Sequence, residues 1–131
     1  MVSTDSIGDM IVRIRNASAT NKSQVVFPLS KNILAVAQAL ERVGYLDLIS
    51  KKGKKTHRQI EANLVYVGGK PKFKGARRIS NVSKRVYKKI KNVSPIKSGY
   101  GSLIMSTPKG ILTDKEARKE NVGGEALFQI W

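Results

Sequence analysis

The chain has 131 residues, 40% of them hydrophobic, which suits one compact unit or two very small lobes rather than a disordered basic tail. Its 25 Lys and Arg against 9 Asp and Glu give a formal charge of +16 and a pI near 10.4. The absence of cysteine excludes a disulfide framework, a cysteine metal site and a thiol nucleophile, and the first five residues lack the features of a secretion signal.

The first 44 residues predict a helix, a strand and a second helix. Apolar residues recur with helical spacing at Ile7, Met10, Ile11 and Ile14, and residues 4–6 offer N-caps. The other side of this helix carries Arg13, Arg15 and Asn16, followed by a polar stretch at residues 17–23. A β-prone run at residues 25–27 ends at Pro28. Ser30 can then cap a second helix, which Gly44 stops at the position after its C-cap.

Two strands are predicted next, at residues 45–50 and 59–67, joined by a basic turn at residues 51–55. In the second strand, Ile60, Ala62 and Leu64 alternate with outward-facing residues, as in a half-buried strand. This helix–strand–helix–strand–strand arrangement predicts an N-terminal α/β lobe over residues 1–67. Residues 68–71 contain two glycines and a proline and are predicted to be a linker.

Residues 72–131 are predicted to form a strand-rich C-terminal lobe with one short helix. Strands are expected at residues 72–79, 85–90, 102–105 and 126–131, with a loop at residues 92–101. Thr113 and Glu116 have the spacing of a capping box, which predicts a helix reaching about residue 120. The predicted fold class is therefore α+β, in two small lobes.

The positive charge is concentrated in the middle of the chain. Residues 51–97 hold 16 Lys and Arg and one acid, Glu61, a local charge of +15, while the flanks are almost neutral. Because so large a surplus costs self-repulsion in the folded state, it favours a polyanionic partner. RNA, DNA, an anionic membrane and an acidic protein all fit this charge, but the longest mostly apolar stretch, residues 33–40, is too short to span a bilayer.

No arrangement of residues in the sequence indicates catalysis or metal binding. His57 is the only histidine and lies in a basic turn, whereas a metal site or a catalytic triad needs further ligands nearby. Asp5 with Asp9, and Glu116 with Glu120, have the spacing of charged helix faces rather than of a cleft. We therefore expect no enzyme, no metal site and no cofactor.

Cations, an aromatic ring and hydroxyls are mixed at two places. Arg85, Tyr87 and Lys89 share one face of the predicted strand at residues 85–90, with Lys88 beside them. Cations pair with phosphates and a tyrosine ring can stack on a base. A solvated charge run, with the ring covering apolar surface, explains this strand equally well when it is taken alone. Inside a segment of charge +15, binding is the favoured interpretation.

The second place is the segment Ser106-Thr107-Pro108-Lys109-Gly110, before the predicted short helix. Small hydroxyls let a backbone approach nucleic acid closely and can hydrogen-bond 2′-OH groups and base edges, which suits the shallow minor groove of RNA. The lysine can pair with phosphate and the glycine permits a tight path. Taken alone, the segment is more typical of an ordinary turn.

Three separated motifs together resemble one family. They are DMIVRIRNA at residues 9–17, RVYK at residues 85–88, and STPKGILTDKEAR at residues 106–118 followed by GGE at residues 123–125. They are similar to the first helix, the middle motif and the C-terminal signature of ribosomal protein eight of the small subunit, in its bacterial and organellar form. The resemblance covers essentially the whole chain, in the right order.

The resemblance implies two α+β lobes, no enzymatic activity, and direct binding to the central domain of small-subunit ribosomal RNA during assembly. It implies that the C-terminal lobe is the main RNA-binding lobe and that the N-terminal lobe adds contacts. The residues it points to in the C-terminal lobe are Ser106, Thr107, Lys109, Gly110, Tyr87, Arg85, Lys88, Gly123, Gly124 and Glu125. Those in the N-terminal lobe are Thr4, Arg15, Asn16, Lys31 and Lys55.

Two departures from the family pattern affect individual contacts. Pro108 stands where the family usually has a third small hydroxyl, so that contact is missing. Asn81-Val82-Ser83 stands where the family commonly shows Arg-Pro-Gly, which removes one cation and requires the turn to be shaped without proline or glycine. The basic surface is unaffected by either change.

The expected partners are small-subunit ribosomal RNA and neighbouring ribosomal proteins, with no membrane and no obligate homo-oligomer. The expected location is the cytoplasmic ribosome of a bacterium or the ribosome of an organelle. Repression of a messenger RNA that resembles the ribosomal site is a compatible second role. A nuclease and a non-specific DNA binder are the alternatives, which RNA turnover with a divalent metal and competition with duplex DNA would reveal.

Overall fold

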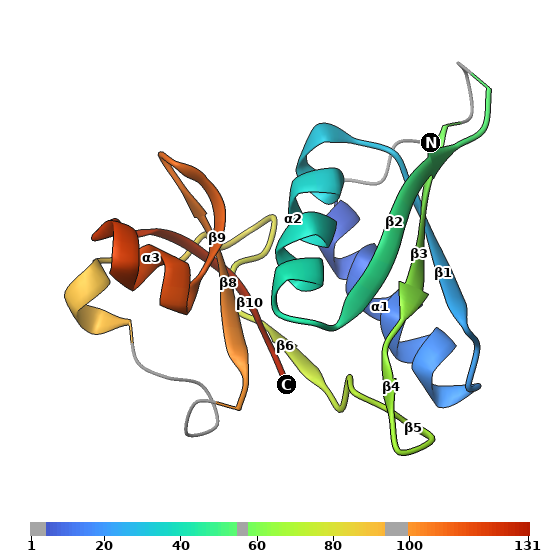
Figure 1. The fold of residues 1–131 in the computed structure, drawn as a ribbon. Coiled ribbons are helices and arrows are strands. Elements are labelled where there is room, and N and C mark those ends of the chain that lie inside the picture. The colour runs from blue at the N-terminus through green and yellow to red at the C-terminus, as the bar shows by residue number, and fades with distance from the viewer. Residues whose placement is uncertain (1–4, 55–57, 94–99) are drawn as a thin grey trace. The chain divides into compact units, whose positions relative to one another are not determined.

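A computed structural model of the protein describes residues 5–54, 58–93 and 100–131 and is drawn in Figure 1. The chain divides into two compact units, Met1–Lys74 and Gly75–Trp131. Helices and antiparallel sheets occur within both units, so the predicted α+β fold in two small lobes is confirmed. Among the described residues, no helix is both long and apolar enough to cross a membrane.

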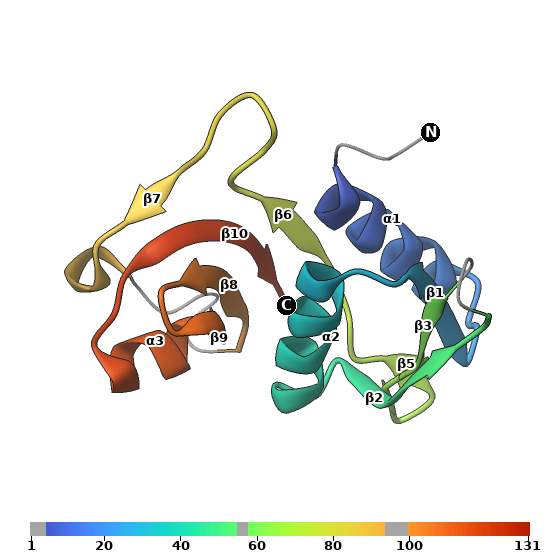
Figure 2. The ribbon, with the colours of Figure 1, turned by 90° about the horizontal axis from the view of Figure 1, so that it is seen from above.

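The first unit consists of two helices packed on one face of a three-stranded antiparallel sheet (Figures 1 and 2). Its elements in chain order are α1 (Ser6–Ala19), β1 (Gln24–Pro28), α2 (Lys31–Arg42), β2 (Leu46–Lys52) and β3 (Gln59–Leu64). The sheet order is β1-β3-β2, so the last strand lies between the other two. The order of elements matches the helix–strand–helix–strand–strand prediction.

The helix ends of the first unit are fixed by the residues that the sequence suggested. The Asp5 side chain accepts a hydrogen bond from Gly8 N (3.1 Å) and caps α1, and Ser30 Oγ accepts from Ile33 N (3.1 Å) and caps α2. Gly44 follows the C-cap of α2 with φ of +87°, a left-handed conformation that glycine adopts without a steric penalty. The apolar faces of both helices are thereby held over the sheet.

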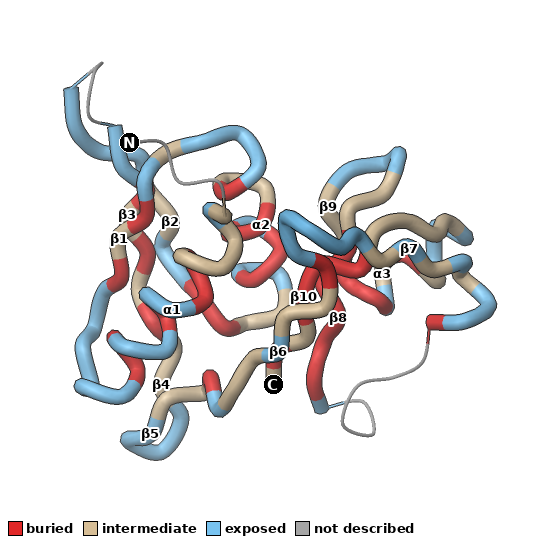
Figure 3. The backbone as a smooth tube through the Cα atoms, turned by 180° about the vertical axis from the view of Figure 1, so that it is seen from behind, coloured by how far each residue is buried: buried red, intermediate tan, exposed pale blue. Residues whose placement is uncertain are grey.

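The core of the first unit lies between the helices and the sheet, where buried segments are drawn red in Figure 3. Met10 and Ile14 of α1, Leu40 of α2, Phe27 of β1 and Ile60 of β3 are all at most 2% exposed. Burying each such side chain contributes roughly 1.5–3 kcal/mol. The exposed positions of the two helices are mostly polar, with Val12 (47% exposed) as an apolar exception.

The predicted strand at residues 59–67 is interrupted. β3 ends at Leu64, and β4 (Tyr66–Val67) pairs instead with β5 (Lys70–Pro71) in a two-stranded hairpin. Gly68 and Gly69 form its turn, with φ of +60° and +78°. Residues 68–71, expected to be a linker, therefore lie in a hairpin of the first unit, which continues to Lys74.

The second unit is built around a sheet that runs β6-β10-β8-β9, with β7 also pairing with β10. Its elements are β6 (Ala76–Arg78), β7 (Tyr87–Lys88), the 3₁₀ turn η1 (Ile90–Asn92), β8 (Ser102–Thr107), β9 (Gly110–Thr113), α3 (Asp114–Glu120) and β10 (Gly124–Ile130). Thr113 and Glu116 form the predicted capping box of α3 in both directions. Val93, Leu103, Met105, Ala117 and Ala126 make a buried cluster in this unit.

Two strand predictions for the second unit were wrong in extent, and one strand was missed. The strand expected at residues 72–79 is only the three residues of β6, and the one expected at 85–90 is only β7. The latter is short because Val86 N donates to Ser80 Oγ (2.8 Å) and because η1 begins at Ile90. β9 was not predicted. It is a short strand between the Pro108–Gly110 turn and the capped helix, where the sequence predicted only the segment that leads into that helix.

Candidate nucleic-acid interface

Three of the residues singled out in the sequence lie side by side on the sheet of the second unit. Glu125 of β10 is opposite Tyr87 of β7 on one side and opposite Ser106 of β8 on the other. Directly paired residues of antiparallel strands project from the same face. We call these residues the Tyr87–Glu125–Ser106 row. The next position along, Ala126 opposite Met105, is fully buried, so the row faces away from the core.

The row offers a ring and a hydroxyl for contact. Tyr87 is 72% exposed, which leaves its ring available for stacking on a base. Ser106 is partly exposed, and within the described residues its hydroxyl makes no hydrogen bond. An uncharged donor and acceptor beside an exposed ring is suited to the 2′-OH groups and base edges of RNA.

Glu125 is partnered within the protein. Its carboxylate lies 3.3 Å from Arg85 Nη1 and its side chain is only 15% exposed, while that of Arg85 is 53% exposed. The guanidinium offsets the negative charge in the row, and its exposed part remains available to a phosphate. The sequence predicted that Arg85 and Tyr87 share one face of a strand. In the structure β7 begins only at Tyr87, so Arg85 lies before the strand and is linked to the row by its contact with Glu125.

The hydroxyl-rich segment forms the turn of the β8–β9 hairpin. Thr107 Oγ1 donates to Gly110 O (2.7 Å) and accepts from Lys109 N (3.2 Å), so this hydroxyl closes the turn. Gly110 has φ of +111°, which a side chain would disfavour. Lys109 Nζ lies 3.3 Å from Glu120 at the end of α3. Exposed pairs of this kind are worth about 0–1 kcal/mol, so a phosphate can displace the carboxylate.

Gly123 and Gly124 let the start of β10 pass close to two neighbouring backbones. A Cβ on Gly123 would lie 2.5 Å from Lys88 O, and one on Gly124 would collide with Ser106 O. Neither glycine has a positive φ, so the requirement is for space rather than for an unusual backbone conformation. The two glycines therefore set the spacing of the strands that carry the row.

The turn before β7 is shaped without the proline and glycine that the family commonly has there. Asn81 Oδ1 accepts hydrogen bonds from Ser83 N (3.0 Å) and Lys84 N (2.8 Å), and Asn81 N donates to Lys84 O (2.9 Å). Ser80, which is buried, holds the far end of the loop through Val86. An asparagine side chain thus replaces the fixed backbone of proline in forming the turn.

The residues suggested for the N-terminal lobe lie in the first unit. Arg15 and Asn16 are exposed on α1, and Lys31 is exposed at the first position of α2. Thr4 and Lys55 lie outside the described residues, as does His57. Of the predicted basic turn, Lys51 and Lys52 lie at the end of β2 and Lys54 follows it, and all three are exposed.

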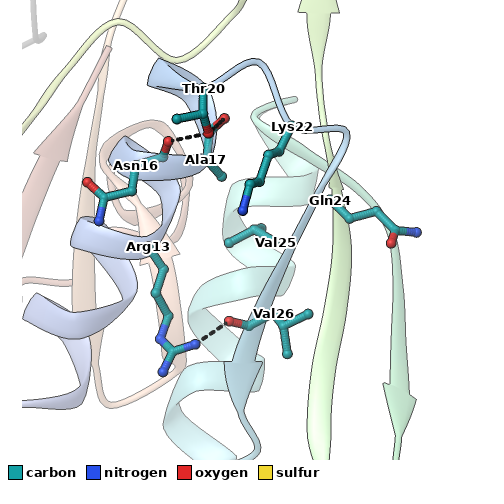
Figure 4. Close-up of a pocket in the computed structure, with 8 residues that line it drawn as sticks. All are labelled: Arg13, Asn16, Ala17, Thr20, Lys22, Gln24, Val25 and Val26. Atoms are coloured by element: carbon teal, nitrogen blue, oxygen red, sulfur yellow. Dashed lines mark hydrogen bonds between the residues drawn. The ribbon is translucent and has the colours of Figure 1, made fainter.

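Sequence reasoning missed a groove of about 390 Å³ between the end of α1 and β1 (Figure 4). Its lining includes Arg13, Asn16, Thr20, Lys22 and Gln24, over an apolar floor. The polar stretch after α1 was visible in the sequence, but its juxtaposition with β1 depends on how the chain turns back at residues 20–23.

The carboxylates that were considered for acid–base chemistry have structural partners. Asp9 pairs with Arg13 (2.9 Å), and Glu116 accepts from Thr113 N (3.0 Å) in the capping box. Asp114, which is buried, accepts from Leu103 N (3.2 Å) and pairs with Arg118 (3.1 Å). In the described part of the chain no group of three or more His, Cys, Asp or Glu is arranged to hold a metal ion.

Comparison with known proteins identifies the family of the chain. Residues 5–131 match the family described as ribosomal protein S8. The chain belongs to the ribosomal protein S8 family. It is 42% identical to small ribosomal subunit protein uS8 of Mycoplasmopsis agalactiae over 131 residues, which is the whole of both chains. The corresponding protein of Novosphingobium aromaticivorans is 41% identical over the same length, and that of Gluconobacter oxydans is 41% identical over 129 residues, 98% of each chain.

Membership of the S8 family confirms the resemblance seen in the three sequence motifs. The family is structural and non-enzymatic, so the chain is a ribosomal protein with a structural role, located in the ribosome. The nuclease alternative is thereby set aside. The individual RNA-contacting residues remain predictions. The row shows how three of them are aligned on the sheet.

Proposed function

We propose that this protein binds directly to the central domain of small-subunit ribosomal RNA and supports assembly of that subunit. The observation that carries the proposal is the Tyr87–Glu125–Ser106 row, an exposed ring and a hydroxyl held on a rigid sheet beside cations. Rigid placement matters because an RNA helix of irregular shape is recognised by contacts at fixed spacing. Neighbouring ribosomal proteins are further partners.

Affinity and selectivity come from different groups in this proposal. Arg85, Lys88 and Lys109 neutralise phosphates, which binds any RNA and weakens as salt rises. Tyr87 stacks on a base, and Ser106 exchanges hydrogen bonds with a sugar or base edge. Gly123 and Gly124 act on binding through the strand spacing they permit, rather than through contacts of their own.

Chemical footprinting of small-subunit RNA with and without the full-length protein tests the proposal. We expect a compact protected patch in the central domain. Protection spread thinly over the RNA, or as strong on unrelated folded RNA, would contradict it.

The assignment of the row is tested by Ser106→Ala, with Ser50→Ala as the control. Ser50 is also a partly exposed strand serine, but it lies in the first unit. Loss of one hydrogen bond should weaken binding to the cognate RNA about fivefold and leave binding to a scrambled RNA unchanged. Equal losses on both RNAs would remove Ser106 from the site.

We also propose repression of a messenger RNA as a secondary role. A surface that recognises local shape and a few base edges accepts any RNA with the same local fold, whether ribosomal or messenger. Recovery of one transcript with the protein from ribosome-free fractions supports this role, and its absence there contradicts it.

A further inference from the structure

The groove between α1 and β1 in the first unit has a composition suited to a nucleotide. Two cations, Arg13 and Lys22, and the polar side chains of Asn16 and Thr20 line it. Its floor is made by Ala17 and Val25, which are 6% and 5% exposed. None of the residues that line it is a carboxylate, so an anion entering it meets no like charge from the walls.

Arg13 is already oriented at one end of the groove. Its Nε donates to Asp9 Oδ2 (2.9 Å) and its Nη1 donates to Val26 O (3.0 Å), the second of which is drawn in Figure 4. A guanidinium carries five N–H donors, so donors remain for a ligand. Since the side chain is held by two contacts, less conformational entropy is lost when it binds an anion.

Lys22 supplies a second cation from a fixed backbone. Lys22 N donates to Ala17 O (2.9 Å), and Lys22 O accepts from the hydroxyl of Tyr66 in β4 (2.5 Å). Figure 4 shows the Lys22 side chain extending over the space between α1 and β1, whereas Gln24 points away from α1. Within the described residues, the Lys22 ammonium has no hydrogen-bond or ion-pair partner.

The polar wall is formed by the last turn of α1. Thr20 Oγ1 donates to Asn16 O (2.9 Å), so the hydroxyl keeps its capacity to accept. The Asn16 amide, which is exposed and makes no hydrogen bond within the described residues, offers both a donor and an acceptor. Groups of this kind can recognise a ribose hydroxyl or a base edge beside the cations.

The size of the groove favours a whole nucleotide over a single phosphate group as its ligand. At about 390 Å³ it falls within the ~300–1,000 Å³ typical of small-ligand sites and exceeds what one phosphate occupies. A phosphate would use the two cations but leave the Ala17 and Val25 floor uncovered. A nucleotide combines an anion with flat apolar faces and polar edges, which matches all three parts of the lining.

We propose that this groove binds one unstacked nucleotide of the RNA, with its phosphate between Arg13 and Lys22 and its sugar or base on the floor. The inference rests on the proposed RNA-binding function and adds a second, localised reading site in the first unit. In this site Asn16 acts together with Arg13, Thr20 and Lys22, which line the same groove. The sequence motifs singled out none of these three residues for RNA.

The test compares Lys22→Met and Asn16→Ala with Lys70→Met in the full chain, using the same small-subunit RNA and 2′-hydroxyl acylation to probe every nucleotide. Lys70 is an exposed lysine of β5 in the same unit and serves as the matched loss of charge. We expect Lys22→Met to weaken binding about tenfold and to remove the protection of one or two adjacent nucleotides. Asn16→Ala should change the same nucleotides, and Lys70→Met should leave the protection pattern unchanged.

Four other results would overturn the inference. If Lys22→Met and Asn16→Ala only lower affinity as Lys70→Met does, with every nucleotide still protected, the groove binds no defined nucleotide. If the nucleotides whose protection changes lie in a continuous helix and stay stacked, the groove contacts only a phosphate and does not bind an unstacked nucleotide. If these variants leave RNA binding intact while Ser106→Ala still weakens it, the groove fails and the proposed function stands; an unmodified protein without any central-domain footprint would remove both.

Discussion

The two units differ in how they hold the residues that we propose contact RNA. In the second unit, the Tyr87–Glu125–Ser106 row lies across three paired strands, and the strand spacing is set by a glycine pair with backbone on both sides. In the first unit, exposed cations lie at a helix end and on turns, such as Lys22 and Lys54. In our proposal, strand pairing provides the spacing that selects an RNA, while cations on helix ends and turns provide attraction and local contacts.

The largest effect is expected from Gly124→Ala. The new methyl group would collide with Ser106 O, which belongs to a paired strand and cannot move away easily. We expect a loss of about 3 kcal/mol in the free energy of unfolding, at the upper end of overpacking costs, and loss of selective RNA binding. Urea unfolding gives the stability, and hydrogen exchange should place the loss in β8 and β10.

Gly69→Ala is the control for that substitution. Gly69 has φ of +78° in the β4–β5 turn, and no atom lies within 4 Å of the position of a Cβ there. A cost of about 1 kcal/mol confined to the first unit is expected, from the backbone conformation alone. Equal effects of the two alanines on β8 and β10 exchange would show that the glycine pair does not set the strand spacing.

Tyr87→Ala should lower affinity for the cognate RNA by about tenfold or more, because one stacking contact is worth ~1–3 kcal/mol. Tyr87→Phe keeps the ring and should retain most of the affinity. Tyr100→Ala is the matched control, since Tyr100 is an even more exposed tyrosine of the same unit (89%) that lies outside the row. Comparable losses for Tyr87→Ala and Tyr100→Ala, measured by filter binding, would mean that the row has no special role.

A smaller effect is expected from the pair formed by Arg85 and Glu125. Arg85→Ala leaves the carboxylate beside the RNA without its guanidinium, so affinity should fall about tenfold, more than for one lost phosphate contact. Adding Glu125→Gln to that variant should recover about threefold, because the uncompensated charge is removed. A double-mutant cycle in RNA binding measures this coupling, and strictly additive changes would argue against it.

The smallest effect concerns the stability of the first unit at alkaline pH. Burial raises the pKa of Tyr45 above its ordinary value of 10.0, because the ionised form is disfavoured away from water. The unfolded chain therefore loses this proton first, so the stabilisation is complete below pH 10 and is lost as the pH rises through the folded pKa. The free energy of unfolding of Tyr45→Phe should therefore fall less steeply than that of the unmodified protein as the pH rises above about 9. Identical pH profiles would contradict the assignment to Tyr45.

Much of the fold could be predicted because the relevant signals are local. Helical spacing of apolar residues, Ser30 and Gly44 at the ends of α2, and the Thr113–Glu116 capping box all act within a few residues. The strands of the second unit were less predictable, since β7 and β9 are short and are defined by their partners rather than by their own composition.

The candidate site was predicted as residues but not as an arrangement. Tyr87, Ser106 and Glu125 were each singled out, yet their alignment in one row depends on the register of strands that are distant in sequence. Thr107 was expected to contact RNA, while the structure uses its hydroxyl to close a turn. The groove near Lys22 was not foreseen, because its two walls meet only after the chain reverses.

The central claim is that Tyr87 and Ser106, the two uncharged members of the row, choose the RNA while the surrounding cations bind it, and one measurement tests this most directly. Affinities of Tyr87→Ala, Ser106→Ala and Lys88→Gln for cognate and scrambled RNA are compared over a range of salt concentrations. The first two variants should lose discrimination between the RNAs with an unchanged salt slope. Lys88→Gln should weaken both RNAs alike and flatten the slope by about 0.7–0.9. Loss of discrimination in Lys88→Gln, with discrimination retained in the other two, would contradict the account.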